Sequence, residues 1–492
     1  MLAAALGAAG ASADWGPESY LTQWSVGGSW TSPNNARCLA ASGDTVYLVW
    51  HDYRMGPAPN RGCRIFFKYF DGSAWSEDAL IGAFLNSGFQ NWNASCAVDQ
   101  SGRLHVVWES NDVNYPDQGN YDIVHRSLYN SVWSAAVKLT THPQFSWHPA
   151  VAAGPGGRLD VFWQDNRGGT FRLYHRMFDG SAWQGEYCAA PQGSASSYPS
   201  AASTQGRPAV AWQDFRTGIN QIFFMTQGPG GWGTDSAVSR STAGAYIPCL
   251  VADQGGNLHL AWEDYRDGNS EIYYRRLPAA TGAWEPEVRV TFDLSHSRAP
   301  VMACRGDSLV DLFWADDRDG GNEIYTVQSK RGYWGAEQRL TFQEAASLSP
   351  AAAADARGNL HLAWTDMRGN PGYAPEIYHM SNVVSPWPKS GPGGGTGRLV
   401  SRLSASPNPA SGPVVFEFDL ERPLAGGAAA LGIYDLAGRL VARRNVHSPM
   451  TGRNTVSWDG RGEDGKRPAS GVYLARLEAD GQSASRRVVI IR

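Results

Sequence analysis

One pairing of an acid with a base recurs through the sequence. A tryptophan is followed two residues later by an aspartate and four residues later by an arginine, as in Trp262, Asp264 and Arg266. A carboxylate and a guanidinium can form a bidentate ion pair, and the same two groups can bind a polar ligand. The six copies are Asp52/Arg54, Asp165/Arg167, Asp214/Arg216, Asp264/Arg266, Asp316/Arg318 and Asp366/Arg368. Because one active site needs only one of each group, we predict that these pairs form a structural repeat that braces the fold.

As a brace, each arginine is expected to bond to the glutamate that opens the following strand: Arg266 to Glu271, Arg318 to Glu323 and Arg368 to Glu376. The alternative is a ring of equivalent weak sites whose binding adds up by multivalency. The acidic turn at residues 317–323 also offers oxygen ligands for calcium, but it lacks the dense alternation of acids found in a dedicated loop. We therefore predict no metal and no cofactor, with calcium as an alternative.

Residues that differ between the repeats are better candidates for a single binding site. Aromatic residues and histidines precede the short apolar segment of several repeats, where they are expected at one end of the strands. Exposed aromatic rings beside polar groups suit stacking on sugars, and packing over the strand ends is the alternative. Two acids lie in the one repeat that lacks the Asp-x-Arg pair. The candidate ligand-binding residues are Trp92, Trp147, His148, Tyr198, Tyr246, His296, Glu109 and Asp112, and no catalytic residue is assigned.

The elements that carry these residues repeat along the chain. The first tryptophan recurs at Trp50, Trp108, Trp163, Trp212, Trp262, Trp314 and Trp364, at intervals of 49 to 58 residues by subtraction. A second recurs at Trp75, Trp133, Trp183, Trp232, Trp284 and Trp334. Each unit reads as four short strands with alternating apolar residues, and four antiparallel strands at this period predict a propeller blade. The sequence thus predicts an all-β fold with a seven-bladed β-propeller.

The seventh repeat lacks the strand that carries the second tryptophan. The segment at residues 15–22, WGPESYLT, matches WGAEQRLT at residues 334–341 in five positions. We therefore expect the N-terminal strand to complete the last blade and close the ring, since closure removes exposed sheet edges.

Four regions follow from composition. Residues 1–13 are small and apolar and are predicted to be a signal peptide, although they lack the Lys or Arg that usually lies near the N-terminus of such a peptide. Residues 14–384 hold the propeller, residues 385–397 are a Pro/Gly linker, and residues 398–492 contain strands that read as an immunoglobulin-like sandwich. The protein is therefore expected to be secreted or displayed on the cell surface.

Charge, apolar stretches and cysteine spacing limit the classes of partner and of covalent cross-link that the chain can have. The formal net charge is -4 and no basic run stands out, which argues against nucleic acid. No later apolar stretch is long enough to span a membrane. None of the six cysteines forms a Cys-x-x-Cys pair; most are predicted to be small buried residues, with a Cys38–Cys96 disulfide as an alternative. A monomer that binds a glycan or a surface protein is expected.

The repeat, with Trp-x-Asp-x-Arg followed by Glu-Ile-Tyr, resembles secreted bacterial propellers of the sialidase-like, BNR-repeat group over residues 14–384. Sialidases usually have six blades, and their Ser-x-Asp-x-Gly-x-Thr-Trp box is absent here. The resemblance implies an arginine triad, a tyrosine nucleophile with a glutamate partner and an aspartate acid/base. No singular set of such residues can be picked out, because Arg, Asp and Tyr occur in this chain as repeats.

The C-terminal segment carries SPNP at residues 406–409, IYDLAGRLV at residues 433–441 and WDGRGEDGKRPASGVYLARL at residues 458–477. These motifs resemble the immunoglobulin-like domain of the flagellar hook-capping family and the C-terminal sorting domains of type IX secretion substrates. The resemblance implies export, with attachment to the surface or release.

Two functions are carried forward. The first is a secreted or cell-surface propeller without catalysis that binds a glycan or protein at its loop face, favoured by the uniformity of the repeats. The alternative is a sialidase-like glycoside hydrolase or polysaccharide lyase, which would need a carboxylate, a tyrosine or histidine, and an arginine converging at the channel mouth.

Overall fold

Apolar residues alternate with polar ones between short Gly- and Asp-rich turns, and this pattern gives antiparallel strands throughout the described chain. The computed structural model describes residues 15–22, 28–31, 38–54, 62–81, 90–111, 120–369 except 229, 308 and 331, and 375–382. It also describes residues 400–491 except 409, 421–423, 425–428, 436–438, 447–449, 464 and 480–481. The predicted signal peptide and linker lie outside the described residues.

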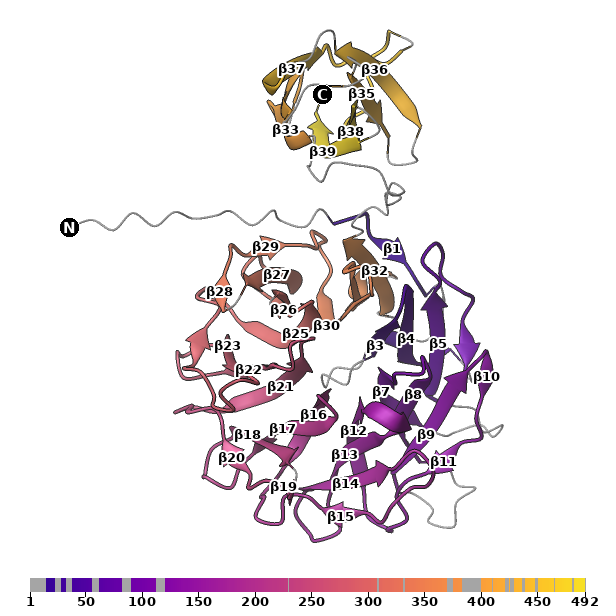
Figure 1. Cartoon of the computed structure of the whole chain (residues 1–492), viewed down its shortest axis with the longest axis vertical. Helices are drawn as coiled ribbons and strands as arrows, with labels where there is room; N and C mark the ends of the chain where they lie inside the picture. Colours follow the sequence, from indigo (N-terminus) through magenta and orange to yellow (C-terminus); the bar gives the residue numbers. More distant parts are fainter. Residues whose placement is uncertain are drawn as a thin grey trace, which may run out of the picture. The chain divides into compact units, whose positions relative to one another are not determined.

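The chain divides into two compact units, Met1–Pro386 and Trp387–Arg492. In the described part of the first unit, strands form seven antiparallel sheets (Figure 1). The only helical segments described are the short 3-10 turns η1 (Pro155–Gly157) and η2 (Met367–Gly369). The fold is therefore all-β, as the sequence predicted.

Each sheet of the first unit is built from strands of four kinds. The inner strands are β3 (Leu39–Ser42), β7 (Asn91–Val98), β12 (Ser146–Ala153), β16 (Ser197–Thr204), β21 (Ala245–Ala252), β25 (Ser297–Arg305) and β30 (Ser347–Ala354). The second strands are β4 (Thr45–Asp52), β8 (Leu104–Ser110), β13 (Leu159–Asp165), β17 (Arg207–Asp214), β22 (Leu258–Asp264), β26 (Leu309–Asp316) and β31 (Leu360–Asp366). The third strands are β5 (Arg64–Phe70), β9 (Asp122–Tyr129), β14 (Arg172–Phe178), β18 (Gln221–Gly228), β23 (Glu271–Leu277), β27 (Glu323–Lys330) and β32 (Glu376–Asn382).

The outer strands have only two residues each. They are β1 (Ser19–Tyr20), β6 (Ala79–Leu80), β10 (Val132–Trp133), β11 (Val137–Lys138), β15 (Tyr187–Cys188), β19 (Gly231–Trp232), β20 (Ser236–Ala237), β24 (Val288–Arg289), β28 (Tyr333–Trp334) and β29 (Gln338–Arg339). In three sheets the outer strand is split in two, with one piece holding the second tryptophan and the other following it, whereas the sequence analysis expected one continuous strand. A further short strand, β2 (Ser29–Trp30), pairs with β4 next to β3.

The inner strands contact one another in chain order: β3 with β7, β7 with β12, β12 with β16, β16 with β21, β21 with β25, β25 with β30, and β30 with β3. Figure 1 shows these strands nearest the centre of the first unit. The N-terminal β1 pairs with β32, with Ser19 opposite His379 and Tyr20 opposite Tyr378. The end of the first unit is therefore hydrogen-bonded to its beginning.

Tryptophans fill the space between neighbouring sheets. The seven tryptophans of the second strands are at most 1% exposed. One apolar cluster joins Trp314 to Trp364, and another joins Trp50, Trp108 and Ala363 from three different sheets. Because each sheet buries both faces against its neighbours, packing rather than any single sheet stabilises the unit. Cys38, Cys63, Cys96 and Cys249 are buried, as predicted for most of the six cysteines, and no disulfide joins Cys38 to Cys96.

The second unit has two antiparallel sheets around its own core. The first holds β33 (Val400–Ser406), β34 (Val414–Leu420) and β37 (Gly452–Trp458). The second holds β36 (Leu440–Val446), β35 (Ala429–Tyr434), β38 (Gly471–Ala479) and β39 (Gln482–Ile490). Phe416, Phe418 and Trp458 are fully buried in this core, which is the arrangement expected of a two-sheet sandwich.

Candidate functional site

The six Asp-x-Arg pairs share one set of contacts. In the sheet of β22, the buried carboxylate of Asp264 accepts bonds from Trp262 Nε1 (3.0 Å), Ser241 Oγ (2.7 Å) and the Arg266 guanidinium (Nε, 2.9 Å). The Arg266 guanidinium also lies 4.3 Å from the ring centre of Tyr273, and the six equivalent arginines lie 4.1 to 4.5 Å from the matching aromatic ring. Each pair is therefore saturated by contacts within its own sheet.

The second acid bonded to each arginine is not the one expected from the sequence. Arg266 pairs with Glu287 (2.9 Å), and the acid in every copy lies three residues after the second tryptophan. The expected partner Glu271 is buried, and its oxygens accept bonds from Arg289 and Thr291 Oγ1 instead. The six acids are Glu18, Asp78, Glu186, Asp235, Glu287 and Glu337. The three expected arginine–glutamate pairs, Arg266–Glu271, Arg318–Glu323 and Arg368–Glu376, were therefore wrong.

Four of the candidate ligand-binding residues lie together at the start of the inner strands. Trp92 begins β7, Trp147 and His148 begin β12, and Tyr198 begins β16. The rings of His148 and Tyr198 stack with centroids 4.7 Å apart, and Trp147 lies 6.4 Å from His148. All four side chains are half-buried.

Three further aromatic residues extend this group. The ring of Tyr121 lies 6.2 Å from Trp92 and 6.3 Å from Trp147. Trp147 also contacts Phe145 at 5.1 Å and Phe171 at 5.2 Å. We call Trp92, Tyr121, Phe145, Trp147, His148, Phe171 and Tyr198 the aromatic cluster. Sequence analysis missed Tyr121, Phe145 and Phe171, which lie just before strands and share no spacing with the other members.

A β-bulge interrupts the inner strands β7, β12 and β16 next to these side chains. His148 and Tyr198 are the bulge residues, with φ of 51° and 53°, in the left-handed region that non-glycine residues seldom occupy. The bulge breaks the pairing of the inner strand with the second strand for two residues. Their side chains and amides thereby become available to the neighbouring sheet.

Glu109 lies beneath the aromatic cluster. It is 3% exposed, and its two oxygens accept bonds from Asn93 Nδ2 (2.8 Å) and the His148 backbone N–H (2.9 Å). Burial raises the pKa of Glu109 to about 7, although these two bonds act in the opposite direction. Burial lowers the pKa of His148 to about 4, so its ring is neutral near pH 7 and bonds to Gln164 Oε1 through Nδ1 (3.0 Å).

The remaining candidates lie elsewhere or cannot be described. Tyr246 packs edge-on against Tyr265 at 5.4 Å. His296 Nδ1 accepts the N–H of Ser270 at 3.1 Å. Among the described residues, no contact joins Tyr246 or His296 to the aromatic cluster. Asp112 lies outside the described residues.

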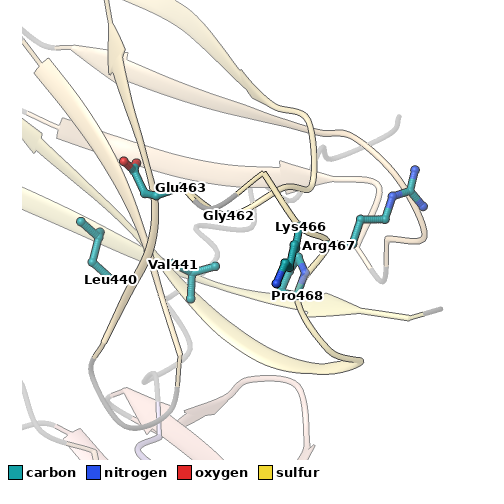
Figure 2. Close-up of a pocket in the computed structure, with 7 residues that line it drawn as sticks. All are labelled: Leu440, Val441, Gly462, Glu463, Lys466, Arg467 and Pro468. Atoms are coloured by element: carbon teal, nitrogen blue, oxygen red, sulfur yellow. The ribbon is translucent and has the colours of Figure 1, made fainter.

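No group of three or more His, Cys, Asp or Glu residues within the described ranges could hold a metal ion. The described part of the chain also has no helix long and apolar enough to cross a membrane. One pocket of about 300 Å³ lies in the second unit, lined by Leu440, Val441, Gly462, Glu463, Lys466, Arg467 and Pro468 (Figure 2). In that pocket Glu463 accepts the backbone N–H of Arg443 (2.8 Å), which ties the turn to β36.

Comparison with known proteins gives a family match for the second unit alone. Residues 404–483 match the FlgD Ig-like domain. No curated protein matches the chain.

Solved structures resemble the chain at low identity. A polysaccharide lyase of family PL25, an ulvan lyase, is 11% identical over 73% of this chain and 94% of its own, with a TM-score of 0.49. The phage phi92 endosialidase is 10% identical over 79% of this chain and 72% of its own, with a TM-score of 0.46. PorZ, a surface component of the type-IX secretion system of Porphyromonas gingivalis, is 14% identical over 92% of this chain and 59% of its own, with a TM-score of 0.40.

Proposed function

We propose that residues 14–384 form a seven-bladed β-propeller that works outside the cell and binds a glycan at the aromatic cluster. Seven sheets whose inner strands touch in chain order, with β1 hydrogen-bonded to β32, support a closed ring. The FlgD Ig-like match supports a separate role for residues 398–492, which we propose to be export or anchoring. The six Asp-x-Arg pairs then serve the fold, since every bonding group in them is already engaged.

The observation that carries the binding proposal is the gathering of half-buried aromatic rings over three neighbouring sheets. The pyranose face of a sugar is apolar and its rim is polar, so it binds where aromatic rings lie beside hydrogen-bonding groups. Here the rings of Trp147 and Tyr198 lie beside the neutral His148, which bonds to Gln164. The equivalent positions in the sheets of β25 and β30 hold Arg298, Ala299, Leu348 and Ser349, so the aromatic side chains do not continue into these two sheets.

Hydrolysis or elimination is the second candidate. The buried Glu109 carboxyl, with its raised pKa, lies near Tyr121 and Tyr198, whose own pKa values are raised by burial and then by the charge of Glu109. A carboxyl that is protonated near neutral pH can act as a general acid. Both oxygens of Glu109 are however occupied by Asn93 and His148, and its side chain is closed to solvent. These contacts favour a binding site over a catalytic one.

The test is a panel of polysaccharides incubated with residues 14–384, scored for retained glycan and for released product together. Trp147→Ala should weaken retention about tenfold or more, because a stacked aromatic at the centre of a site contributes about 1.4 kcal/mol or more. The matched control is Tyr333→Ala, which removes an 84% exposed ring on the outer strand β28 and should change nothing. Product release would overturn the binding proposal in favour of catalysis. Retention that survives Trp147→Ala would place the site elsewhere, and no retention at all would indicate a protein ligand.

A further inference from the structure

One residue position connects neighbouring sheets at five places in the first unit. It directly follows the tryptophan of the second strand, and in five of the seven sheets its side chain accepts a hydrogen bond from a backbone N–H of the next sheet, whereas the other two sheets hold His51 and Ala315 there. In each contact a backbone N–H donates to a side-chain oxygen. The donor and acceptor residues are His148 and Glu109 (2.9 Å), Tyr198 and Gln164 (3.2 Å), Ile247 and Gln213 (3.1 Å), Ala299 and Glu263 (2.6 Å), and Thr31 and Thr365 (2.9 Å). We call these five contacts the inter-sheet latches.

The latches supply a hydrogen-bond acceptor for backbone N–H groups that the bulges turn away from their own sheet. A bulge residue turns its N–H away from its own sheet, and a buried amide without an acceptor is costly. A side-chain oxygen from the neighbouring sheet satisfies it. The residue types differ widely between repeats, yet glutamate, glutamine and threonine all present an oxygen at the same place. The shared feature is therefore the acceptor, and the charge is incidental to bonding.

At Glu109 the latch leads into the aromatic cluster. Glu109 holds the backbone of His148, whose ring stacks on Tyr198 at 4.7 Å. The Tyr198 N–H is itself held by Gln164 Oε1, which also bonds to His148 Nδ1. The two latches thus fix the backbone and the ring orientation of adjacent members of the cluster. We propose that Glu109 is a positioning residue for the aromatic cluster, acting through the His148 amide, and that its burial makes the stability of the first unit depend on pH.

The surroundings of Glu109 set the direction of that dependence. The groups that face it are Asn93 on β7, Tyr121 before β9, His148 on β12 and Tyr198 on β16, and none of them is cationic near pH 7. Burial holds the pKa of Glu109 at about 7, above the ordinary value of 4.5. A raised pKa means that ionisation is harder in the folded chain than in the unfolded one. Stability from this residue is therefore full below about pH 4.5, falls as the pH rises to about 7, and stays reduced above that.

The latch can be tested without any ligand, by hydrogen exchange of the His148 amide in the full chain, read by mass spectrometry with residue-level fragmentation. Glu109→Ala should raise the exchange rate of this amide at least tenfold, whereas Glu109→Gln should keep it slow, because Gln164 and Gln213 hold the same contact in their own sheets. In the glutamine variant the Asn93 amide can turn its oxygen toward the new Nε2. Unchanged protection in Glu109→Ala would overturn the proposal.

The pH dependence has its own test, which also stands if Glu109→Ala fails to fold. The urea midpoint of Glu109→Gln minus that of the wild type should be larger at pH 8 than at pH 5. Gln213→Glu should produce the reverse, since it buries a new acid at an equivalent latch. Differences that do not vary with pH would contradict the proposal.

Effects on glycan affinity rest on the proposed function. The control is Glu263, whose carboxyl is buried with a pKa raised to about 7 and whose latch holds Ala299, away from the aromatic cluster. Glu109→Ala should weaken glycan retention several-fold, and Glu263→Ala should not. Equal effects of the two variants would contradict a positioning role. If the wild type retains no glycan, the proposed function fails, while the exchange and pH measurements still decide the latch.

Discussion

The carboxylate of each Asp-x-Arg pair accepts hydrogen bonds from several donors at once. Asp316 accepts bonds from Trp314 Nε1 (2.8 Å), Ser297 Oγ (2.8 Å) and the guanidinium of Arg318 (Nη2, 2.7 Å). Burial alone would raise the pKa of Asp316, but these bonds, led by those from Arg318, lower it instead. A carboxylate that stays ionised while fully buried is stabilised by its hydrogen-bond donors, and those buried donors in turn need it as their acceptor.

Replacing this aspartate should therefore be costly. Asp316→Ala leaves Trp314 Nε1 and Ser297 Oγ without their acceptor and Arg318 with Glu337 as its remaining acid, and removing one partner of a buried ion pair costs about 3–5 kcal/mol. Urea unfolding of the first unit measures the loss. The control is Arg357→Ala, which breaks the half-exposed pair with Asp44 and should cost about 1 kcal/mol or less. A similar small cost for both variants would show that the six pairs contribute little to the fold.

The sequence predicted which of these residues recur but not what they touch. Arg266 was expected to pair with Glu271, because that glutamate opens the next strand. The acid that pairs with it is Glu287, which directly precedes the outer strand β24 of the same sheet. Spacing locates a residue on its own strand, and pairing across three strands depends on side-chain direction. Four members of the aromatic cluster, Trp92, Trp147, His148 and Tyr198, were predicted because their residue types differ between repeats. Their contacts were not predicted, because the bulge that brings His148 onto Tyr198 leaves no mark in a single sequence.

At the level of elements, the N-terminal segment joins the last sheet by more than its two-residue strand. Gly16 N–H donates to the Ser381 carbonyl and Leu21 N–H to the Ile377 carbonyl, both at 2.9 Å. Glu18 pairs with Arg368, and Trp15 lies edge-on 5.6 Å from Phe313. These are the contacts that the outer strand makes in the other sheets. The match between residues 15–22 and 334–341 predicted them, because a repeated motif carries its contacts with it.

Removing residues 15–22 should consequently expose the edge of β32 and leave Arg368 without its outer acid. We expect a lower urea midpoint and increased light scattering, since an unpaired edge strand favours association. A synthetic peptide of residues 14–22 added in excess should restore the midpoint in a concentration-dependent way. A peptide with Trp15 and Glu18 replaced by alanine is the control and should restore little. A truncated chain as stable as the full one would contradict closure through β1.

Other features of the elements exceed what periodicity can predict. The outer strand is interrupted after its tryptophan in three sheets, as between Val132–Trp133 and Val137–Lys138. The inner strands run eight residues in most sheets, although only their apolar half was expected to be strand. Half-buried polar strand ends lack the alternation that identifies a strand from sequence.

At the scale of the whole molecule, the chain holds two separate cores. The two compact units divide between Pro386 and Trp387, within the segment at residues 385–397 that the sequence predicts to be a linker. The core of the second unit, including Phe416 and Trp458, contains no residue of the first. Because each unit buries its own apolar surface, each has what it needs to fold as an independent domain.

Calorimetry of the full chain should therefore resolve two unfolding transitions. Phe416→Leu removes part of a fully buried ring in the second unit and should cost about 1 kcal/mol, which lowers the Tm of a domain of this size by about 4–8 °C. The transition of the first unit should not move. Phe162→Leu, at a fully buried ring in the sheet of β13, is the reciprocal variant and should shift only the other transition. One transition that moves as a whole in both variants would mean that the two units unfold together, and the C-terminal unit would then be an integral part of the binding protein rather than a separable export module.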